Sequence, residues 1–242
     1  MLALVRLILL AFAIVLISIA FCCFCLFRPF HRDNVHYAAM TLSKLSRLIG
    51  LTVEVRKDAY DEKNTPVVFI ANHQNNYDIF TMSHAVQAGT VSVGKKSLKW
   101  IPFFGQMYWL TGNILIDRNN SSKAISTIGM TADKIKSKKL SVWLFPEGTR
   151  SNGRGLLPFK TGAFRTAAQA NVPLVPVCAS NQHKTINLNR WDNGKVIIEF
   201  LPAQIIEEDS REGLRKKADE MHTLMQNKIE QLTEEANAFN QQ

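Results

Sequence analysis

The amino-acid sequence predicts an α/β fold: one domain with a largely parallel central sheet flanked by helices, preceded by an N-terminal apolar membrane helix. After residue 50, short runs of β-branched residues alternate with longer segments of helical spacing, a rhythm typical of a largely parallel sheet. Before residue 28, a long apolar stretch carries no charge. The 242 residues suffice for one substantial core, and no linker rich in Pro, Gly or Ser divides them. We therefore expect an anchor over residues 1–33 and one domain over residues 34–242.

The first expected element is a membrane helix over residues 7–27. These 21 residues carry no charged side chain. With a rise of about 1.5 Å per residue they span roughly 31 Å, close to the hydrocarbon thickness of a bilayer. A cleaved signal peptide is the alternative, but its apolar core is typically about 7 to 15 residues long and ends at small residues. The run here ends in phenylalanines, which favours an anchor that stays in place.

The orientation of this helix follows from the basic residues on either side of it. Arg6 precedes the helix, and four basic residues follow it: Arg28, Arg32, Lys44 and Arg47. The positive-inside rule places the body of the protein in the cytoplasm if the helix crosses the membrane fully. The rival geometry is an anchor in a single leaflet, followed by a helix over residues 35–48.

The elements after the anchor are expected in alternation. The β-branched runs predicted to form strands cover residues 51–55, 67–71, 91–93, 113–116, 141–145, 174–178 and 196–201. The segments predicted to form helices cover residues 77–87, 121–138, 162–170 and about 210–236, the last of them charged and amphipathic. Residues 181–194 are expected to form a long loop.

One segment departs from the pattern of a simple globular domain. Lys95, Lys96 and Lys99 come directly before an aromatic stretch over residues 100–110. Tryptophan and tyrosine favour the boundary between lipid headgroups and hydrocarbon, where lysines attract phosphates. This segment is predicted to form either a second membrane contact or a buried packing helix, since large apolar side chains are usually core residues.

Charge and cysteine content narrow the function classes. Lys and Arg outnumber Asp and Glu by 29 to 20, a net charge of +9, which favours anionic partners. The apolar anchor and the lack of a nucleic-acid-reading motif argue against nucleic acid. Three of the four cysteines lie in the anchor and Cys178 stands alone, so their spacing indicates neither a disulfide framework nor a metal site.

A histidine and an aspartate follow the strand expected at residues 67–71. His73 stands at the carboxyl edge of this strand, where open α/β sheets bind ligands, and Asp78 follows five residues later. On a straight helix the two would lie about 140° apart, so their contact requires a turn, for which Asn75 and Asn76 are suited. A carboxylate that accepts from one imidazole nitrogen leaves the other as a general base. The alternative is a helix-capping aspartate beside a core histidine.

Two further strand ends carry charged residues. Arg118 follows the strand at residues 113–116, and the segment Phe145-Pro-Glu-Gly-Thr-Arg-Ser151 follows the strand at residues 141–145. Gly148 lets backbone N–H groups approach a ligand, and Arg118 and Arg150 can each hold a phosphate through two parallel hydrogen bonds. Three strand ends therefore offer one base and two anion-binding side chains.

Four blocks in this order resemble those of the glycerolipid acyltransferases. The blocks are residues 73–78, with the H-x4-D motif, 112–118, 145–151 and 172–177. Residues 72–78, 95–105 and 158–162 resemble in particular the bacterial 1-acyl-sn-glycerol-3-phosphate (lysophosphatidic acid) acyltransferases of gammaproteobacterial type. One departure is Ile116, where many relatives carry Phe.

The resemblance implies a membrane enzyme of phospholipid biosynthesis. His73, held by Asp78, would take the proton of the sn-2 hydroxyl of lysophosphatidic acid as that hydroxyl attacks an acyl thioester, giving phosphatidic acid without an acyl-enzyme. Arg118 and Arg150 would hold the acceptor's phosphate in a substrate pocket shaped by the neighbouring residues Glu147, Gly148 and Thr149.

The resemblance also implies partners and a location. The last block, Val175, Pro176 and Val177, would line the acyl pocket. The acyl donor would be a thioester of acyl carrier protein or of coenzyme A, with no cofactor and no metal. The enzyme would bind membrane lipids and lie at the bacterial inner membrane with its catalytic domain on the cytoplasmic side.

Two other functions stay open at this point. A non-catalytic membrane protein that binds anionic lipid explains the anchor and the net charge but gives no role to the His-Asp pair. A metal-dependent phosphohydrolase would use His73, Asp78, Asp117 and Glu147 as ligands of a divalent ion. Two arginines at the same rim, and no second histidine at a suitable spacing, disfavour the phosphohydrolase.

Overall fold

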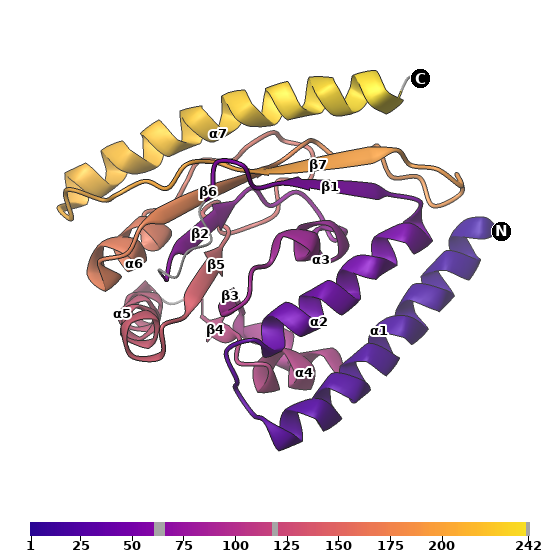
Figure 1. Cartoon of the computed structure of the whole chain (residues 1–242), viewed down its shortest axis with the longest axis horizontal. Coiled ribbons are helices and arrows are strands. Elements are labelled where there is room, and N and C mark those ends of the chain that lie inside the picture. The colour runs from indigo at the N-terminus through magenta and orange to yellow at the C-terminus, as the bar shows by residue number, and fades with distance from the viewer. Residues whose placement is uncertain (61–65, 118–120, 241–242) are drawn as a thin grey trace.

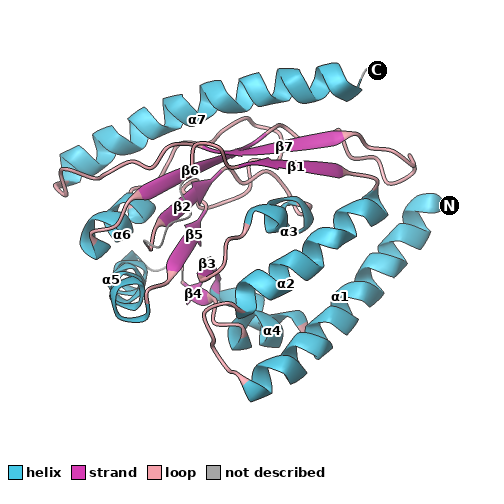
Figure 2. Cartoon of the chain, in the orientation of Figure 1, coloured by secondary structure: helices cyan, strands magenta, loops and turns pink. Residues whose placement is uncertain are grey.

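The computed structural model describes residues 1–60, 66–117 and 121–240. A seven-stranded sheet lies between two layers of helices (Figure 1), which confirms the predicted α/β fold. One layer consists of α5 (Ser121–Lys138), α6 (Gly162–Ala170) and α7 (Arg211–Asn240). The other consists of α1 (Leu2–Phe27), α2 (Asn34–Ser43), α3 (Asp78–Thr81) and α4 (Phe104–Leu110). Each layer covers one face of the sheet (Figure 2).

Every predicted strand is present, within two residues at either end. The strands are β1 (Thr52–Arg56), β2 (Val68–Ala71), β3 (Thr90–Lys95), β4 (Ile114–Ile116), β5 (Ser141–Leu144), β6 (Leu174–Ala179) and β7 (Lys195–Phe200). Their order across the sheet is β1-β7-β6-β2-β5-β3-β4. The five strands from β6 to β4 are parallel, whereas β7 pairs antiparallel with β6, and β1 runs parallel to β7. The connection from β6 to β7 contains no helix to carry the chain back for a parallel pairing, so the chain returns antiparallel.

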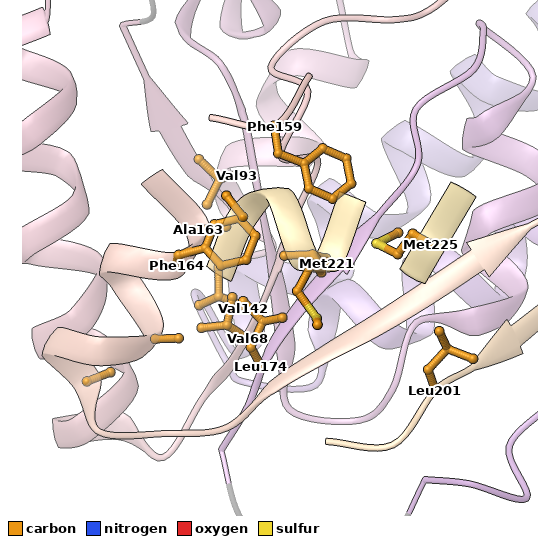
Figure 3. Close-up of a cluster of buried hydrophobic side chains, with 14 of the residues drawn as sticks. Val68, Val93, Val142, Phe159, Ala163, Phe164, Leu174, Leu201, Met221 and Met225 are labelled. Carbon is orange, nitrogen blue, oxygen red and sulfur yellow. The ribbon is translucent and has the colours of Figure 1, made fainter. Parts of the chain in front are cut away.

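Strand β2 lies at the centre of the sheet and all four of its residues are buried. Figure 3 shows the core on the side of α5, α6 and α7, where Val68 of β2 lies with Val142 and Leu174 of the neighbouring strands beneath Phe164 and Met221. A strand buried on both faces needs apolar side chains throughout, which explains why residues 67–71 read as a continuous apolar run.

Helix α7 covers this core with one stripe of its surface. Its buried residues recur at intervals of three, four or seven and are Leu214, Ala218, Met221, Met225, Leu232 and Ala236. That spacing is the amphipathic period that predicted the helix. The helix continues four residues beyond the predicted end at residue 236.

Two segments predicted as single helices each consist of an α-helix followed by a 3-10 helix. Residues 35–48 form α2 and then a 3-10 helix, η1 (Lys44–Ile49), and residues 77–87 form α3 and then η2 (Met82–Ala85). The two 3-10 helices are linked by the contact of Ser46 Oγ with His84 Nε2 at 3.1 Å. Tight turns of this kind commonly finish short helices, and the apolar period of the sequence does not distinguish them from an α-helix.

Helix α1 begins at Leu2, five residues before the predicted start, and therefore includes Arg6. Arg6 is buried, and its guanidinium donates hydrogen bonds to the backbone carbonyls of Leu188, Arg190 and Trp191. The prediction that Arg6 precedes the helix was wrong: the structure places Arg6 within α1, where carbonyls of the β6–β7 loop accept its hydrogen bonds. Among the described residues, α1 is the one helix long and apolar enough to cross a membrane.

The aromatic segment after β3 is divided between core and surface. A 3-10 helix, η3 (Lys96–Trp100), leads into α4, which packs against α1. Met107 is buried in the interior, while Trp100 and Trp109 are 76% and 52% exposed. The packing-helix prediction thus holds for the side of α4 that carries Met107, and the membrane contact of the exposed side stays a prediction.

Candidate active site

The carboxyl ends of β2, β5 and β6 meet at one edge of the sheet. β2 pairs with β5 on one side and with β6 on the other, all in parallel. The loops that follow these three strands, residues 72–77, 145–157 and 180–184, therefore lie together. The sequence delivers polar side chains to each of these loops.

His73 and Asp78 are brought into contact by a tight turn. The Nδ1 atom of His73 lies 2.5 Å from Oδ2 of Asp78. The same oxygen accepts hydrogen bonds from the backbone N–H of Gln74 at 2.7 Å and of Asn75 at 3.2 Å, and Asn75 in turn accepts from the N–H of Tyr77. Asp78 thus holds both the turn and the imidazole, whereas the alternative of a helix cap does not apply, because α3 has no side-chain cap and Asp78 bonds to the turn before it.

This contact assigns the two ring nitrogens of His73. An ionised carboxylate only accepts hydrogen bonds, so Nδ1 carries the proton and Nε2 keeps its lone pair. The side chain of His73 is 15% exposed, and that of Asp78 is 5% exposed. Within the described residues Nε2 has no hydrogen-bond partner. The arrangement supplies a general base directed by a buried carboxylate.

Phe145, the first residue after β5, packs face to face with His73. The ring centroids are 4.0 Å apart and the planes differ by 15°. This contact fixes the plane of the imidazole. The negative face of the phenyl ring also favours the imidazolium that forms when the base accepts a proton.

Glu147 lies beneath the site rather than at its surface. Its carboxylate is buried, with Oε1 accepting from the backbone N–H of His73 at 2.6 Å and Oε2 accepting from that of Leu157 at 3.0 Å. The backbone adds two further links, from Ser151 N to His73 O and from Asn152 N to Gln74 O. The loop after β5 is therefore joined to the turn that holds His73 and Asp78, which we call the catalytic turn. Any effect of Glu147 on substrate would be indirect.

The predicted anion-binding residues follow β4 and β5. Thr149 and Arg150 are exposed at the rim of the site, and Gly148 has a positive φ of +71° that turns the chain toward it. Arg118 lies outside the described residues. β4, which it follows, is three strands from β2, or about 14 Å at the usual strand spacing. Arg150 follows β5, the strand next to β2.

The predicted acyl-pocket residues lie in the interior of the sheet. Val175 and Val177 of β6 are fully buried in the core beneath the layer of α1 to α4, and Pro176 between them is buried too. A cavity of about 350 Å³ adjoins the catalytic turn, lined by Asn72, Gln74 and Glu147 and by residues of α7. The three residues of the last block do not line this cavity, so their predicted role finds no support in its geometry.

Gln182 contacts Asp78, although no pattern in the sequence pointed to it. Its side-chain amide donates a hydrogen bond to Oδ1 of Asp78. It comes from the loop after β6, which was expected to be a connection, and neither spacing nor periodicity relates positions 104 residues apart. The sequence analysis assigns Phe145 no role, although an aromatic residue at the end of a strand beside the histidine strand is a usable signal.

The proposed phosphohydrolase ligands do not converge. Glu147 turns its carboxylate into the fold, and Asp117 follows β4, three strands away from His73. Within the ranges that the structure covers, no three His, Cys, Asp or Glu side chains lie close enough together to hold a metal ion.

Comparisons with known proteins identify the family of this chain. The family model described as Acyltransferase matches residues 52–180. The 1-acyl-sn-glycerol-3-phosphate acyltransferase of Salmonella typhimurium is 51% identical over 225 residues, which cover 91% of this chain and 92% of that protein. The protein of the same name from Escherichia coli K12 is 48% identical over 235 residues, covering 97% of this chain and 96% of the relative. These matches confirm the resemblance inferred from the four blocks.

A solved structure shares the fold. The crystal structure of the 1-acyl-sn-glycerophosphate (LPA) acyltransferase from Thermotoga maritima superposes with a TM-score of 0.68. The alignment covers 95% of this chain and 97% of that chain at 24% sequence identity. At this identity the likeness concerns the fold alone.

The burial of Glu147 predicts a pH dependence of stability. Burial raises the pKa of Glu147 to about 7 from its ordinary value of 4.5, although the hydrogen bonds from His73 and Leu157 act in the opposite direction. Between these values the folded chain binds more protons than the unfolded chain, so the free energy of unfolding falls as pH rises from about 4.5 to 7. The Glu147→Gln variant has no carboxyl to titrate and therefore lacks this pH dependence. The difference in free energy of unfolding between wild type and variant should change by roughly 3 kcal/mol between pH 4.5 and 7.

The measurement is denaturant unfolding in one detergent at several pH values. Glu230→Gln, a change of an exposed glutamate on α7, is the matched control and should track the wild type throughout. A difference between wild type and Glu147→Gln that is constant with pH would show that the carboxyl does not hold its proton in the folded state.

Proposed function

This chain belongs to the acyltransferase family, and we propose that it transfers a fatty acyl group from a thioester to the sn-2 hydroxyl of 1-acyl-sn-glycerol-3-phosphate, giving phosphatidic acid. The observation that carries the proposal is the His73–Asp78 pair, with Nε2 of His73 unpaired at the sheet edge where ligands bind. Relatives named for this activity match more than nine-tenths of the chain. The active enzyme would act in phospholipid biosynthesis.

The proposed chemistry uses one base and no covalent intermediate. Nε2 of His73 takes the hydroxyl proton as the oxygen attacks the thioester carbonyl, and the imidazolium then returns that proton to the departing thiolate as the C–S bond breaks. Asp78 keeps Nδ1 protonated and stabilises the imidazolium. Cys178 is fully buried, and burial raises the pKa of its thiol, so it is a poor nucleophile.

The acceptor's phosphate is proposed to bind Arg150 at the rim, together with Arg118, which lies outside the described residues. Arg150 is exposed and has no ion pair among the described residues, so its fork is available to a phosphate. Gly148 and Thr149 bring the backbone to the same rim. Glu147 supports the pocket from below through its two backbone contacts.

The donor is proposed to be an acyl thioester of acyl carrier protein or of coenzyme A. Both carry negative charge, which suits the basic surface at Lys95 and Lys96, the exposed residues at the junction of β3 and η3. The proposed transfer needs neither a cofactor nor a metal, because the two substrates supply every atom and His73 returns the proton that it takes.

We propose that the enzyme lies at the inner membrane on the cytoplasmic side, anchored in one leaflet. Both ends of α1 contact the folded domain: the N–H of Ala3 donates to Asn189 at 3.0 Å, and beyond the other end Phe30 packs against Trp109 with ring centroids 5.0 Å apart. Figure 1 shows α1 running beside α2 rather than away from the domain. A helix held along its length in this way supports an in-plane anchor over a full span.

The test of the activity is acyl transfer by the purified chain in detergent. With lysophosphatidic acid and either thioester, the wild type should release thiol and form phosphatidic acid. His73→Ala should lose about 100- to 10,000-fold in kcat. Asp78→Asn should lose at least about tenfold, with little change in KM, since the wrong tautomer affects chemistry more than binding. Cys178→Ala should stay active.

Initial-rate patterns separate direct transfer from a covalent route. Intersecting reciprocal plots are expected, because both substrates must be bound before any product leaves. Parallel lines, or an acylated protein after incubation with thioester alone, would return Thr149, Ser151 or Cys178 to consideration as nucleophiles. Lipid binding without any thiol release would favour the non-catalytic membrane protein.

The arginine assignment predicts a selective loss of acceptor affinity. Arg150→Ala and Arg118→Ala should each raise the acceptor KM by about 10- to 150-fold, the worth of hydrogen bonds to a charged group, and leave the donor KM nearly unchanged. Lysine should restore only part of the loss, since a point charge lacks the two-pronged geometry. Arg211→Ala, a change of an exposed arginine on α7, is the control. A variant that weakens only the thioester contradicts the assignment.

The one-leaflet anchor predicts where the N-terminus lies. An epitope tag placed before Met1 should be cleaved by protease in inverted membrane vesicles and protected in right-side-out vesicles. The same tag placed after Gln242 is the control and should behave identically. A full span would reverse the result for the N-terminal tag alone.

A further inference from the structure

The two oxygens of the Asp78 carboxylate have different partners. Oδ2 serves the catalytic turn, accepting from His73 Nδ1 and from two backbone N–H groups. Oδ1 faces the other way and accepts from Nε2 of Gln182. The carboxylate is therefore held on both sides, once by the turn that contains it and once by the loop after β6.

Gln182 is itself fixed in place. It is 1% exposed, and its backbone N–H donates to Oε1 of Gln74 at 2.8 Å. Gln74 is 6% exposed and donates from Nε2 to the carbonyl of Ser180 at 2.8 Å. Two glutamine side chains thus cross between the loops in opposite directions. Asn72 adds a third crossing, because its amide both donates to and accepts from the backbone of Ala179.

The orientation of the Gln182 amide follows from its partner. A carboxylate oxygen offers only an acceptor, so Nε2 must face Asp78 and Oε1 must point away from it. Oε1 is buried and has no hydrogen-bond partner among the described residues. A buried carbonyl without a partner is unfavourable, and the fold bears this cost in order to place the N–H donor of the same amide on Asp78. The cost to the fold points to a use for the amide at Asp78.

We propose that Gln182 is a positioning residue for the acyl transfer, which orients Asp78 so that Oδ2 stays on Nδ1 of His73 as the imidazolium forms. It touches neither the imidazole nor the rim where substrate would bind, and it acts through the carboxylate alone. The inference rests on the proposed function, because it gives Gln182 a role in the proton transfer by His73.

The primary variant is Gln182→Met, which keeps the length of the side chain and removes the donor. Its kcat should fall about 10- to 100-fold, as expected for the loss of a hydrogen bond to a charged group, with the KM of either substrate within about twofold of wild type. A carboxylate with one donor fewer holds the imidazolium proton more strongly, so the acid limb of kcat/KM should move to higher pH. The other charged groups near the turn are the same in both proteins; they are Glu147, Arg154, and Glu230 and Glu234 of α7.

Two further variants keep the test decisive. Gln182→Asn retains an amide one methylene too short for the contact and should show the same pH shift with a smaller loss of kcat. Gln226→Met is the matched control: this exposed glutamine of α7 lines the cavity beside the turn but bonds only to Glu230 of its own helix. Its kcat and pH profile should equal those of the wild type.

A double-mutant cycle separates action through Asp78 from general loosening of the loop. If Gln182 works through the carboxylate, Gln182→Met should cost little in an Asp78→Asn background, because the two changes remove the same function. Additive losses, or single variants with a wild-type pH profile, would overturn the proposal. An inactive wild type would instead refute the proposed function, so the two failures are distinguishable.

Discussion

The Asp78 carboxylate is the point at which the candidate site is tied together. Through Oδ2 it holds His73 and two backbone groups of its own turn, and through Oδ1 it holds Gln182 of a distant loop. A buried carboxylate is unfavourable without such partners, and here hydrogen bonds from both sides replace the lost water. The position of the base therefore depends on loops that follow two different strands, and the sheet sets the distance between them.

The parallel sheet makes this convergence possible. The strands β5, β2 and β6 are neighbours and point the same way, so their following loops share one edge. Glu147 holds the turn from the β5 side, because its carboxylate accepts a hydrogen bond from the backbone of His73. Gln182 holds it from the β6 side through Asp78. The catalytic turn is thus braced from both neighbouring strands, by side chains that are themselves buried.

Local patterns predicted the fold well, and the site only where its residues follow strands directly. The β-branched runs predicted all seven strands, because burial in a sheet selects β-branched and apolar residues over a few consecutive positions. His73, Asp78 and the segment at residues 145–151 were found because they stand at strand ends. The contact of Gln182 with Asp78 and that of Arg6 with the carbonyls of residues 188–191 could not be predicted, because each joins residues more than one hundred positions apart. The winding of η1 and η2 follows from packing, which periodicity does not encode.

Helix α1 contacts the loop before β7, and helix α7 contacts the first residue of β7. Arg6 of α1 binds the carbonyls of residues 188–191, and Asn240, at the end of α7, accepts a hydrogen bond from the N–H of Lys195. During synthesis α1 leaves the ribosome before residues 188–191 exist, so Arg6 has no carbonyl partners until most of the chain has been made. Under the proposed one-leaflet anchor, this order of translation places lipid binding by α1 before the folding of the domain, which then docks onto a helix already held at the bilayer.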